Sequence, residues 1–171
     1  MSAPWSKPLD IDRLADGRTD VDFAVPLAEL PKLRAQFASV AGSVDGRVRF
    51  EREVGVPVAE LKMSGIARLT CQRCLDAMDV VVDRTVRVGL IKAEADVGRV
   101  PEDLEPMLAP EGRISVGQLV EEELLLALPI VPLHDDSAAC GVASSPPSAD
   151  EQEPLTTQKP FERLNELLKR K

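Results

Sequence analysis

The stretch SVDGRVRFE, residues 43–51, decides the fold class, because apolar and charged residues alternate along it. Val44, Val48 and Phe50 fall on one side of an extended chain, together with Gly46, and charged residues fall between them. A period of two is typical of a strand that buries one face. These residues therefore predict a half-buried β-strand.

The same period recurs downstream. Apolar residues at 54–58 and 61–70 continue it, and a further run over 80–90 alternates apolar and polar residues, with Arg84 as the exception on the inner face. The connections are short, and no helical pattern separates the segments. Consecutive strands with short connections favour an antiparallel sheet, which we expect to be curled in a barrel- or sandwich-like form.

Two helices are predicted beside this sheet. Apolar residues near a 3.6-residue period indicate an N-terminal helix over 27–41, with Pro31 tolerated in its first turn. Ser115 and Gln118 have the spacing of a capping box and open a second helix over 115–128. The back half of that helix is apolar on nearly every face, so we expect it to be buried on more than one side.

The remaining segments complete an α+β organisation. Residues 1–22 read as an extended lead-in, 23–140 as a single α+β domain, and 141–158 as a disordered linker rich in Ser, Pro and acid. Residues 159–171 predict a C-terminal helix, because Pro160 suits the first helical turn and Phe161 and Leu164 begin an apolar stripe.

Composition and charge limit the function classes. The chain has 171 residues, is 44% hydrophobic and carries a net charge of −8, so it has no general electrostatic attraction for nucleic acid. Residues 101–158 alone carry a net charge of −11. No apolar run is long enough for a membrane span, and residues 1–12 lack the apolar core of a signal peptide. We therefore expect a cytoplasmic protein.

Cysteine and histidine suggest a metal site. Cys71 and Cys74 form a C-x2-C knuckle between two predicted strands, a spacing that lets two thiolates reach one tetrahedral ion. The chain offers one further pair of ligands, His134 and Cys140, and a sulfur-rich set favours Zn²⁺. The alternative is that both knuckle cysteines act as small, half-buried apolar residues. A thioredoxin-like redox pair is less favoured, because no βαβ pattern surrounds the motif.

Arginines on the predicted sheet suggest a surface that could contact phosphate. Those with outward alternation could form a basic stripe, although the stacking aromatics of single-strand RNA platforms are missing. The alternative is cross-strand ion pairing with Glu51, Glu53, Asp79 and Asp83. The candidate residues for RNA or partner binding are Arg47, Arg49, Arg73 and Arg87 on the sheet, with Phe161 and Leu164 in the C-terminal stripe.

Carboxylate and histidine catalysis find little support. Glu121, Glu122 and Glu123 are consecutive, so on a helix they point about 100° apart, and we expect a solvated polar edge. The chain has one His and no Tyr, which nearly excludes a Ser-His-Asp centre or a centre with several histidines. Hydrolytic processing of RNA is therefore the least favoured function.

Three segments together resemble one bacterial family. They are LTCQRCLDAM (69–78), EEELLLALPIVPLHDDSAAC (121–140) and KPFERLNELLKRK (159–171), and their order and spacing are similar to the YceD family, described as large ribosomal RNA subunit accumulation proteins. Within these segments, the family's C-x2-C-L motif falls on Cys71, Cys74 and Leu75, and its terminal P-F-x-x-L on 160–164.

The resemblance implies a non-enzymatic role in ribosome biogenesis. On this reading the protein supports synthesis, processing or stability of 23S ribosomal RNA by binding a large-subunit precursor. The partner would be the RNA, a basic ribosomal protein or both, and the acidic 101–158 segment makes the protein contact the firmer expectation. The alternative function is a zinc-binding or thiol-redox module built on Cys71 and Cys74.

Overall fold

The structure, a computed structural model, describes residues 4–135 and 140. The main element of the fold is one six-stranded sheet with the strand order β2-β4-β5-β6-β7, and β3 pairs with β5 beside this path. A second, two-stranded sheet pairs β1 with β8. The strands are β1 (Leu9–Asp10), β2 (Asp20–Pro26), β3 (Phe37–Ser39), β4 (Ser43–Glu53), β5 (Val56–Thr70), β6 (Ala77–Ile91), β7 (Glu105–Leu108) and β8 (Arg113–Ile114).

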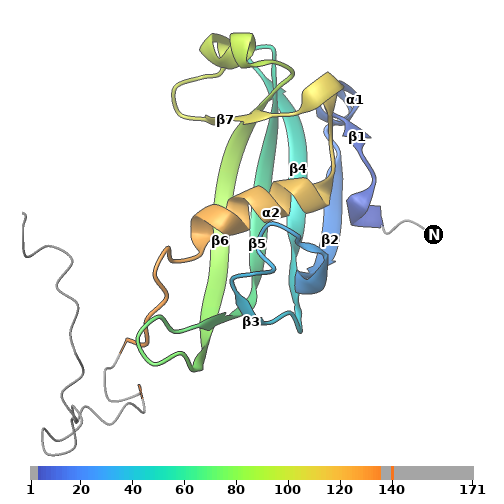
Figure 1. Cartoon of the computed structure of the whole chain (residues 1–171). Helices are drawn as coiled ribbons and strands as arrows, with labels where there is room; N and C mark the ends of the chain where they lie inside the picture. Colours follow the sequence, from blue (N-terminus) through green and yellow to red (C-terminus); the bar gives the residue numbers. More distant parts are fainter. Residues whose placement is uncertain (1–3, 136–139, 141–171) are drawn as a thin grey trace, which may run out of the picture. The chain divides into compact units, whose positions relative to one another are not determined.

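Helices are few, so the fold is α+β with sheet predominating. Figure 1 shows α2 crossing one face of the large sheet. None of the helices in the described part of the chain is long and apolar enough to span a bilayer. The α-helices are α1 (Ile11–Asp16) and α2 (Val116–Ala127), and the 3-10 turns are η1 (Pro4–Ser6), η2 (Leu27–Glu29), η3 (Glu94–Arg99) and η4 (Pro110–Gly112).

The strands β4, β5 and β6 form an antiparallel meander, as the period of two predicts. A two-residue turn at Val54 and Gly55 joins β4 to β5, and both residues have positive φ angles, 47° and 85°. The hairpin of β5 and β6 is longer, with 15 residues in each strand, and Thr70 pairs with Ala77 at its end. The loop that closes this hairpin is the C-x2-C knuckle.

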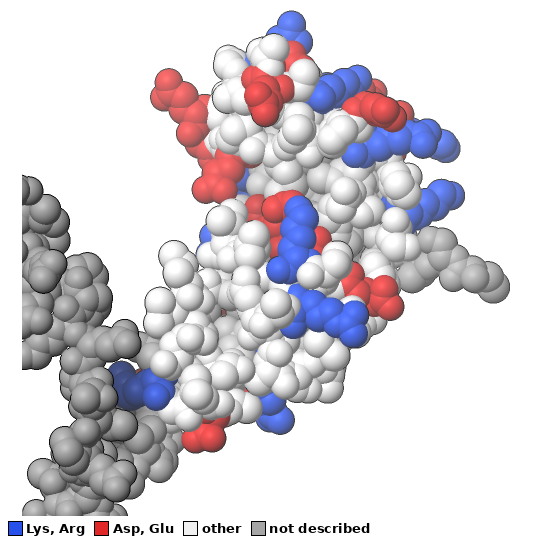
Figure 2. Space-filling view, viewed as in Figure 1, with Lys and Arg blue, Asp and Glu red and all other residues white. Residues whose placement is uncertain are grey.

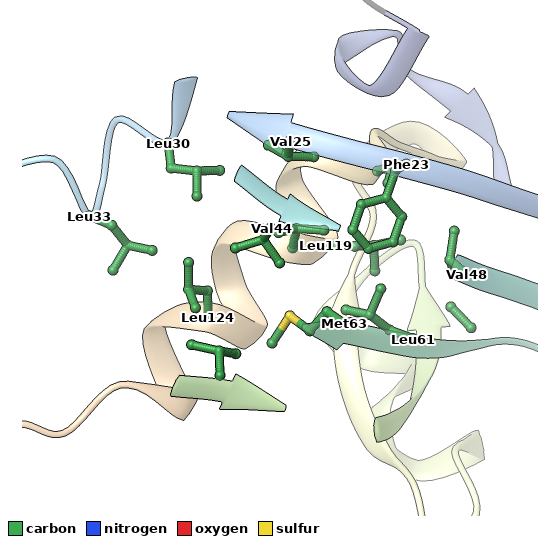
Figure 3. Close-up of a cluster of buried hydrophobic side chains, with 14 of the residues drawn as sticks. Phe23, Val25, Leu30, Leu33, Val44, Val48, Leu61, Met63, Leu119 and Leu124 are labelled. Carbon is green, nitrogen blue, oxygen red and sulfur yellow. The ribbon is translucent and has the colours of Figure 1, made fainter. Parts of the chain in front are cut away.

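The core lies between the sheet and α2. Leu119 and Leu124 of the helix are fully buried, and they face apolar side chains such as Val44 and Leu61 from the sheet (Figure 3). The predicted start of the helix is confirmed. The Ser115 hydroxyl accepts the Gln118 N–H, and the Gln118 side chain accepts the Ser115 N–H in return.

The charged and apolar faces of α2 differ from the expectation in two ways. The expected solvated edge is wrong for Glu121 and Glu123, which are only 5% and 1% exposed. Conversely, Leu125 and Leu126 in the apolar back half are 38% and 61% exposed. The helix covers the sheet with one broad face that includes two carboxylates.

Gly46 shows how closely the central strands approach. A Cβ atom at this position would lie 2.0 Å from the Lys62 carbonyl oxygen of β5 and 2.8 Å from the Phe23 ring of β2. A side chain at position 46 would therefore force the β4 backbone away from its neighbour. The glycine on the apolar side of the alternating stretch is required by this approach.

The predicted N-terminal helix over 27–41 is wrong. This segment contains the turn η2, a series of turns over 31–36 and the short strand β3. Leu30, Leu33 and Phe37 are buried, so their spacing correctly marks an inward face. The Leu33 N–H donates to the Leu30 carbonyl in a tight turn. The Lys32 N–H donates to a carboxylate oxygen of Glu121 in α2 at 2.7 Å. Tertiary contacts thus replace the helical hydrogen bonds.

The expectation of an extended lead-in over 1–22 is wrong as well. Residues 11–16 form α1, which begins where the Asp10 carboxylate accepts the Arg13 N–H at 2.9 Å. Strand β2 already begins at Asp20 and pairs with β4 along its whole length. The alternation of Val21, Phe23 and Val25 with polar or small residues was the signal for this strand.

The sheet is neither wholly antiparallel nor closed. Strand β7 runs parallel to β6, and the connection between them over 92–104 contains η3. Within the described residues β2 and β7 are the ends of the strand order and do not pair with each other, so of the expected barrel- or sandwich-like forms the barrel is wrong. The predicted linker over 141–158 and the C-terminal helix over 159–171 lie outside the described residues.

Candidate metal centre

The knuckle between β5 and β6 is a tight turn held by its own backbone. The Cys71 N–H donates to the Asp76 carbonyl at 2.9 Å, and the Leu75 N–H donates to the Cys71 carbonyl at the same distance. Leu75 adopts a left-handed φ of 66°, which reverses the chain after the second cysteine. This turn aims the Cys71 and Cys74 sulfur atoms at the same region.

The second half of the centre comes from the chain after α2. Helix α2 ends at Ala127, and the following extended segment runs beside the β5–β6 loop (Figure 1). One backbone hydrogen bond ties the two together, from the Gln72 N–H to the Pro132 carbonyl at 2.8 Å. The bond lies two residues before His134, which is next to the knuckle although it follows Cys74 by 60 residues, and the Cys140 sulfur is also close to the knuckle, 3.9 Å from that of Cys71.

The four predicted ligands meet in one cluster. One ligand atom from each of Cys71, Cys74, His134 and Cys140 lies within 4.8 Å of all the others. The His134 Nδ1 atom is 3.5 Å from the sulfur of Cys74 and 3.5 Å from that of Cys140. The sulfur atoms of Cys71 and Cys140 are 3.9 Å apart, and the three cysteines form no disulfide.

These distances fit a tetrahedral ion. With Zn–S near 2.3 Å and Zn–N near 2.0 Å, the edges of a tetrahedron are about 3.5 Å between S and N and about 3.8 Å between two S atoms. The three separations given above, 3.5, 3.5 and 3.9 Å, agree with these edges. A Cys₃His set is a known structural zinc combination, and its thiolates disfavour Mg²⁺ and Ca²⁺.

The protonation of the thiols also suits a cation. Burial by itself raises the pKa of Cys71, but three backbone N–H groups oppose this effect and lower the pKa to about 5. For Cys74 the Asp76 backbone N–H favours the thiolate, yet burial and the two neighbouring thiols raise the pKa to about 11. Cys74 therefore keeps its proton, because a second thiolate beside that of Cys71 would be repelled by it. A dication at the centre would remove this repulsion and favour the thiolate form of both cysteines. The N–H groups at Cys71 belong to Cys74, Arg73 and His134.

The surroundings resemble a structural site more than a reactive one. Cys71 and Cys140 are buried, and Cys74 and His134 are half-buried. Arg73 contributes twice to the outer shell, because its N–H lies 3.4 Å from the Cys71 sulfur and its guanidinium 3.8 Å from the Cys140 sulfur. Donors that point at ligand sulfurs stabilise thiolates and orient them. Arg73, predicted as a phosphate-contacting residue, therefore lies against the thiol cluster.

The other arginines of the predicted basic stripe are engaged by carboxylates. Arg47 and Arg49 each make two hydrogen bonds to one aspartate of β2, at 2.6 and 3.1 Å and at 3.0 and 3.3 Å. Arg87 pairs with Glu53 and lies 3.7 Å from Asp103. The aspartates that hold Arg47 and Arg49 are Asp22 and Asp20.

The pairing of these arginines with carboxylates matches the alternative of cross-strand ion pairs, although some of the partners differ from those expected. Glu53 and Asp79 are among the expected carboxylates, since Arg68 pairs with Asp79 at 2.7 Å. Asp20 and Asp22 were missed because β2 was assigned to the lead-in. Phe161 and Leu164, the remaining candidates for partner binding, lie outside the described residues.

Comparison with known proteins gives one family. A family model described as "Large ribosomal RNA subunit accumulation protein YceD" matches residues 59–168. The matched region contains all four clustered residues and the whole of α2. No solved structure matches this chain.

Proposed function

The chain belongs to the YceD family, and from this premise we propose that it is a non-enzymatic ribosome-biogenesis factor that supports synthesis, processing or stability of 23S ribosomal RNA. In this proposal the protein acts in the cytoplasm by binding a precursor of the large subunit. The observation that carries the proposal is the family match over most of the chain, whose description names accumulation of the large ribosomal RNA subunit and no catalytic activity.

We further propose that Zn²⁺ serves this function as a structural ion. The fit of the Cys₃His separations to tetrahedral edges supports it. The ion would be held by Cys71, Cys74, His134 and Cys140, and it would fix the β5–β6 loop against the segment after α2. It would supply rigidity and no reaction step.

The partner on the precursor is proposed to be a basic ribosomal protein in the first place. The four arginines considered for phosphate contact are already engaged, three by carboxylates and Arg73 by the thiol cluster. The chain is acidic overall, with a net charge of −8. Both facts favour a cationic protein surface over a polyanion.

Sedimentation of ribosomal particles tests the function directly. Cells that lack the protein should show fewer large subunits relative to small subunits and unprocessed or degraded 23S RNA, and the wild-type gene should restore the ratio. A normal ratio in the deletion strain would overturn the proposal. Pull-down at increasing salt then separates the partners, because retention by naked 23S RNA alone would exclude the protein contact.

A thiol-redox module is the second candidate function, and the Cys71 pKa of about 5 is the observation that favours it. A buried thiol with three other ligand atoms within 4.8 Å, one of them the Cys140 sulfur at 3.9 Å, argues more strongly for a metal. Elemental analysis of the purified protein separates the two. One zinc per chain supports the metal centre, whereas a metal-free protein that reduces disulfides supports the redox module.

A further inference from the structure

A second feature of the structure, distant in sequence from the cysteine knuckle, is a groove between α2 and β7. Its volume is about 340 Å³, and it combines apolar walls with three carboxylates. The apolar lining includes Val88, Met107, Leu108, Ile114 and Leu126, and the carboxylates are Glu105, Glu122 and Glu123. Figure 2 shows acidic side chains gathered over α2 and near β7 on this face, above a lower half that is mostly uncharged.

Glu123 is the innermost carboxylate of the groove, and one of its oxygen atoms has no hydrogen-bond partner among the described residues. Its side chain lines the groove although the residue is only 1% exposed, and its Oε2 atom accepts no hydrogen bond from the described residues. A buried carboxylate oxygen without a donor costs free energy, so native proteins rarely retain one. Burial raises the pKa of Glu123, and the nearby Glu105 raises it further. The groove thus contains a carboxylate oxygen that could accept a hydrogen bond from a bound group.

The positive charges nearby leave Glu123 unsatisfied. Lys32 pairs with Glu122 on the outer side of the helix. Arg84, on the inner face of β6, is close enough to lower the pKa of Glu123, but no ion pair joins the two among the described residues. Glu105 on β7 is exposed and is part of the same groove. The groove therefore has a buried carboxylate, Glu123, and an exposed one, Glu105, and neither forms an ion pair with a cation among the described residues.

We infer that this groove binds a lysine or arginine side chain from a cationic segment of a partner protein. The aliphatic stem of such a side chain would pack against the apolar walls, and its charged head would donate to Glu123 and Glu105. A small hydrated ion would leave the apolar walls uncovered, whereas a long basic side chain matches both parts of the groove. The identification of the partner as a ribosomal protein rests on the proposed function. The preference of the groove for a basic side chain does not depend on that function.

A peptide titration monitored by NMR tests the inference on the full-length protein as purified. The probe is a capped heptapeptide, Gly-Lys-Val-Arg-Val-Lys-Gly, and the control peptide replaces arginine by citrulline and lysine by acetyl-lysine. We expect the basic peptide to shift amide resonances of α2 and β7, and the neutral peptide to leave them unchanged. Glu123→Gln and Glu105→Gln should each lower the affinity for the basic peptide about tenfold, because each removes one charged hydrogen bond.

Matched controls keep the result specific. Glu94→Gln removes the same charge from an exposed site on η3, outside the groove, and should bind the peptide like the wild type. Equal affinity in all variants, or no shifts in α2 and β7, would overturn the inference. Shifts caused by CaCl₂ or by a single-stranded RNA instead of the peptide would also overturn it. Because the titration uses purified protein, its failure would leave a changed particle ratio in the deletion strain unaffected.

Discussion

The Gln72 N–H donates to the Pro132 carbonyl at 2.8 Å, and this bond joins the tip of the longest hairpin to the segment that follows α2. Neither residue is a metal ligand, yet the bond holds the segment that carries His134 beside the knuckle. The centre is therefore assembled by main-chain geometry, which leaves the side chains of Cys71, Cys74 and His134 free to bind an ion.

Removing a ligand should destabilise the protein and abolish zinc binding. We expect Cys74→Ser to lower the zinc content from one ion per chain to nearly none and to lower Tm by about 5 °C or more, because the ion links two distant segments. Zinc analysis and thermal unfolding with and without a chelator measure both effects. Gln72→Ala alters a neighbouring side chain but no ligand and should keep the ion. A Tm of the wild type that does not respond to the chelator would contradict the prediction.

The β4–β5 approach predicts a severe effect at Gly46. A Cβ at 2.0 Å from a backbone oxygen cannot be accommodated by a side-chain rotation, so Gly46→Ala should lower the free energy of unfolding by about 2–4 kcal/mol. Urea unfolding gives the value. Gly98→Ala is the control, since an added Cβ at Gly98 meets no atom within 4 Å. Similar stabilities of the two variants would show that β4 can shift without cost.

A substitution in the β4–β5 turn should increase the stability of the protein. Val54 is β-branched, 91% exposed and held at a φ of 47°, a region that asparagine tolerates far better than valine. We expect Val54→Asn to raise the free energy of unfolding by about 1 kcal/mol. Val81→Asn makes the same exchange at an exposed position within β6 and should have a neutral or unfavourable effect. Equal effects at both sites would rule out backbone strain as the cause.

The buried Glu123 predicts a pH dependence of stability. Burial, the nearby Glu105 and then Glu122 raise the pKa of Glu123 above its ordinary value of 4.5, and Arg84 opposes this only in part. The folded state therefore binds a proton that the unfolded state releases, so stability contributed by this group falls as the pH rises from about 4.5 through the raised pKa. Glu123→Gln should be more stable than the wild type at pH 8 and about equally stable at pH 4.

Denaturant unfolding across pH 4–8 measures this difference. Glu94→Gln should follow the wild-type curve, because Glu94 lies in η3 outside the groove. If Glu123→Gln lost stability at pH 8, the carboxylate would have a favourable partner in the folded protein.

Sequence patterns identified the central elements of the fold because their burial is periodic. The alternation around Val48 and the capping box at Ser115 both concern local geometry, and both predictions are confirmed. The segment around Leu33 has helical spacing, but Glu121 from a distant helix takes one of its N–H groups, and no local pattern records that contact. Strand β7 was missed for a different reason, because it has only four residues and one of them is Pro106.

The candidate metal centre was predictable in its members and not in its geometry. Cys71 and Cys74 have a ligand spacing, and the scarcity of histidine and cysteine left His134 and Cys140 as the remaining choices. Their meeting depends on where α2 ends and on the Pro132 carbonyl, which are properties of the folded chain. The burial of Glu123 had no sequence signal, because three consecutive glutamates look alike until one face of the helix is covered.

The ligand spacing along the chain has an entropic consequence. Cys74 and His134 are 60 residues apart, and the stretch between them contains β6, β7 and α2. An ion bound at both ends would restrict the unfolded chain as a cross-link does, by closing a loop of this length, for which loop-closure entropy gives about 4 kcal/mol. Loss of the ion would then favour unfolding by enlarging the unfolded ensemble, even if every native contact outside the cluster stayed in place.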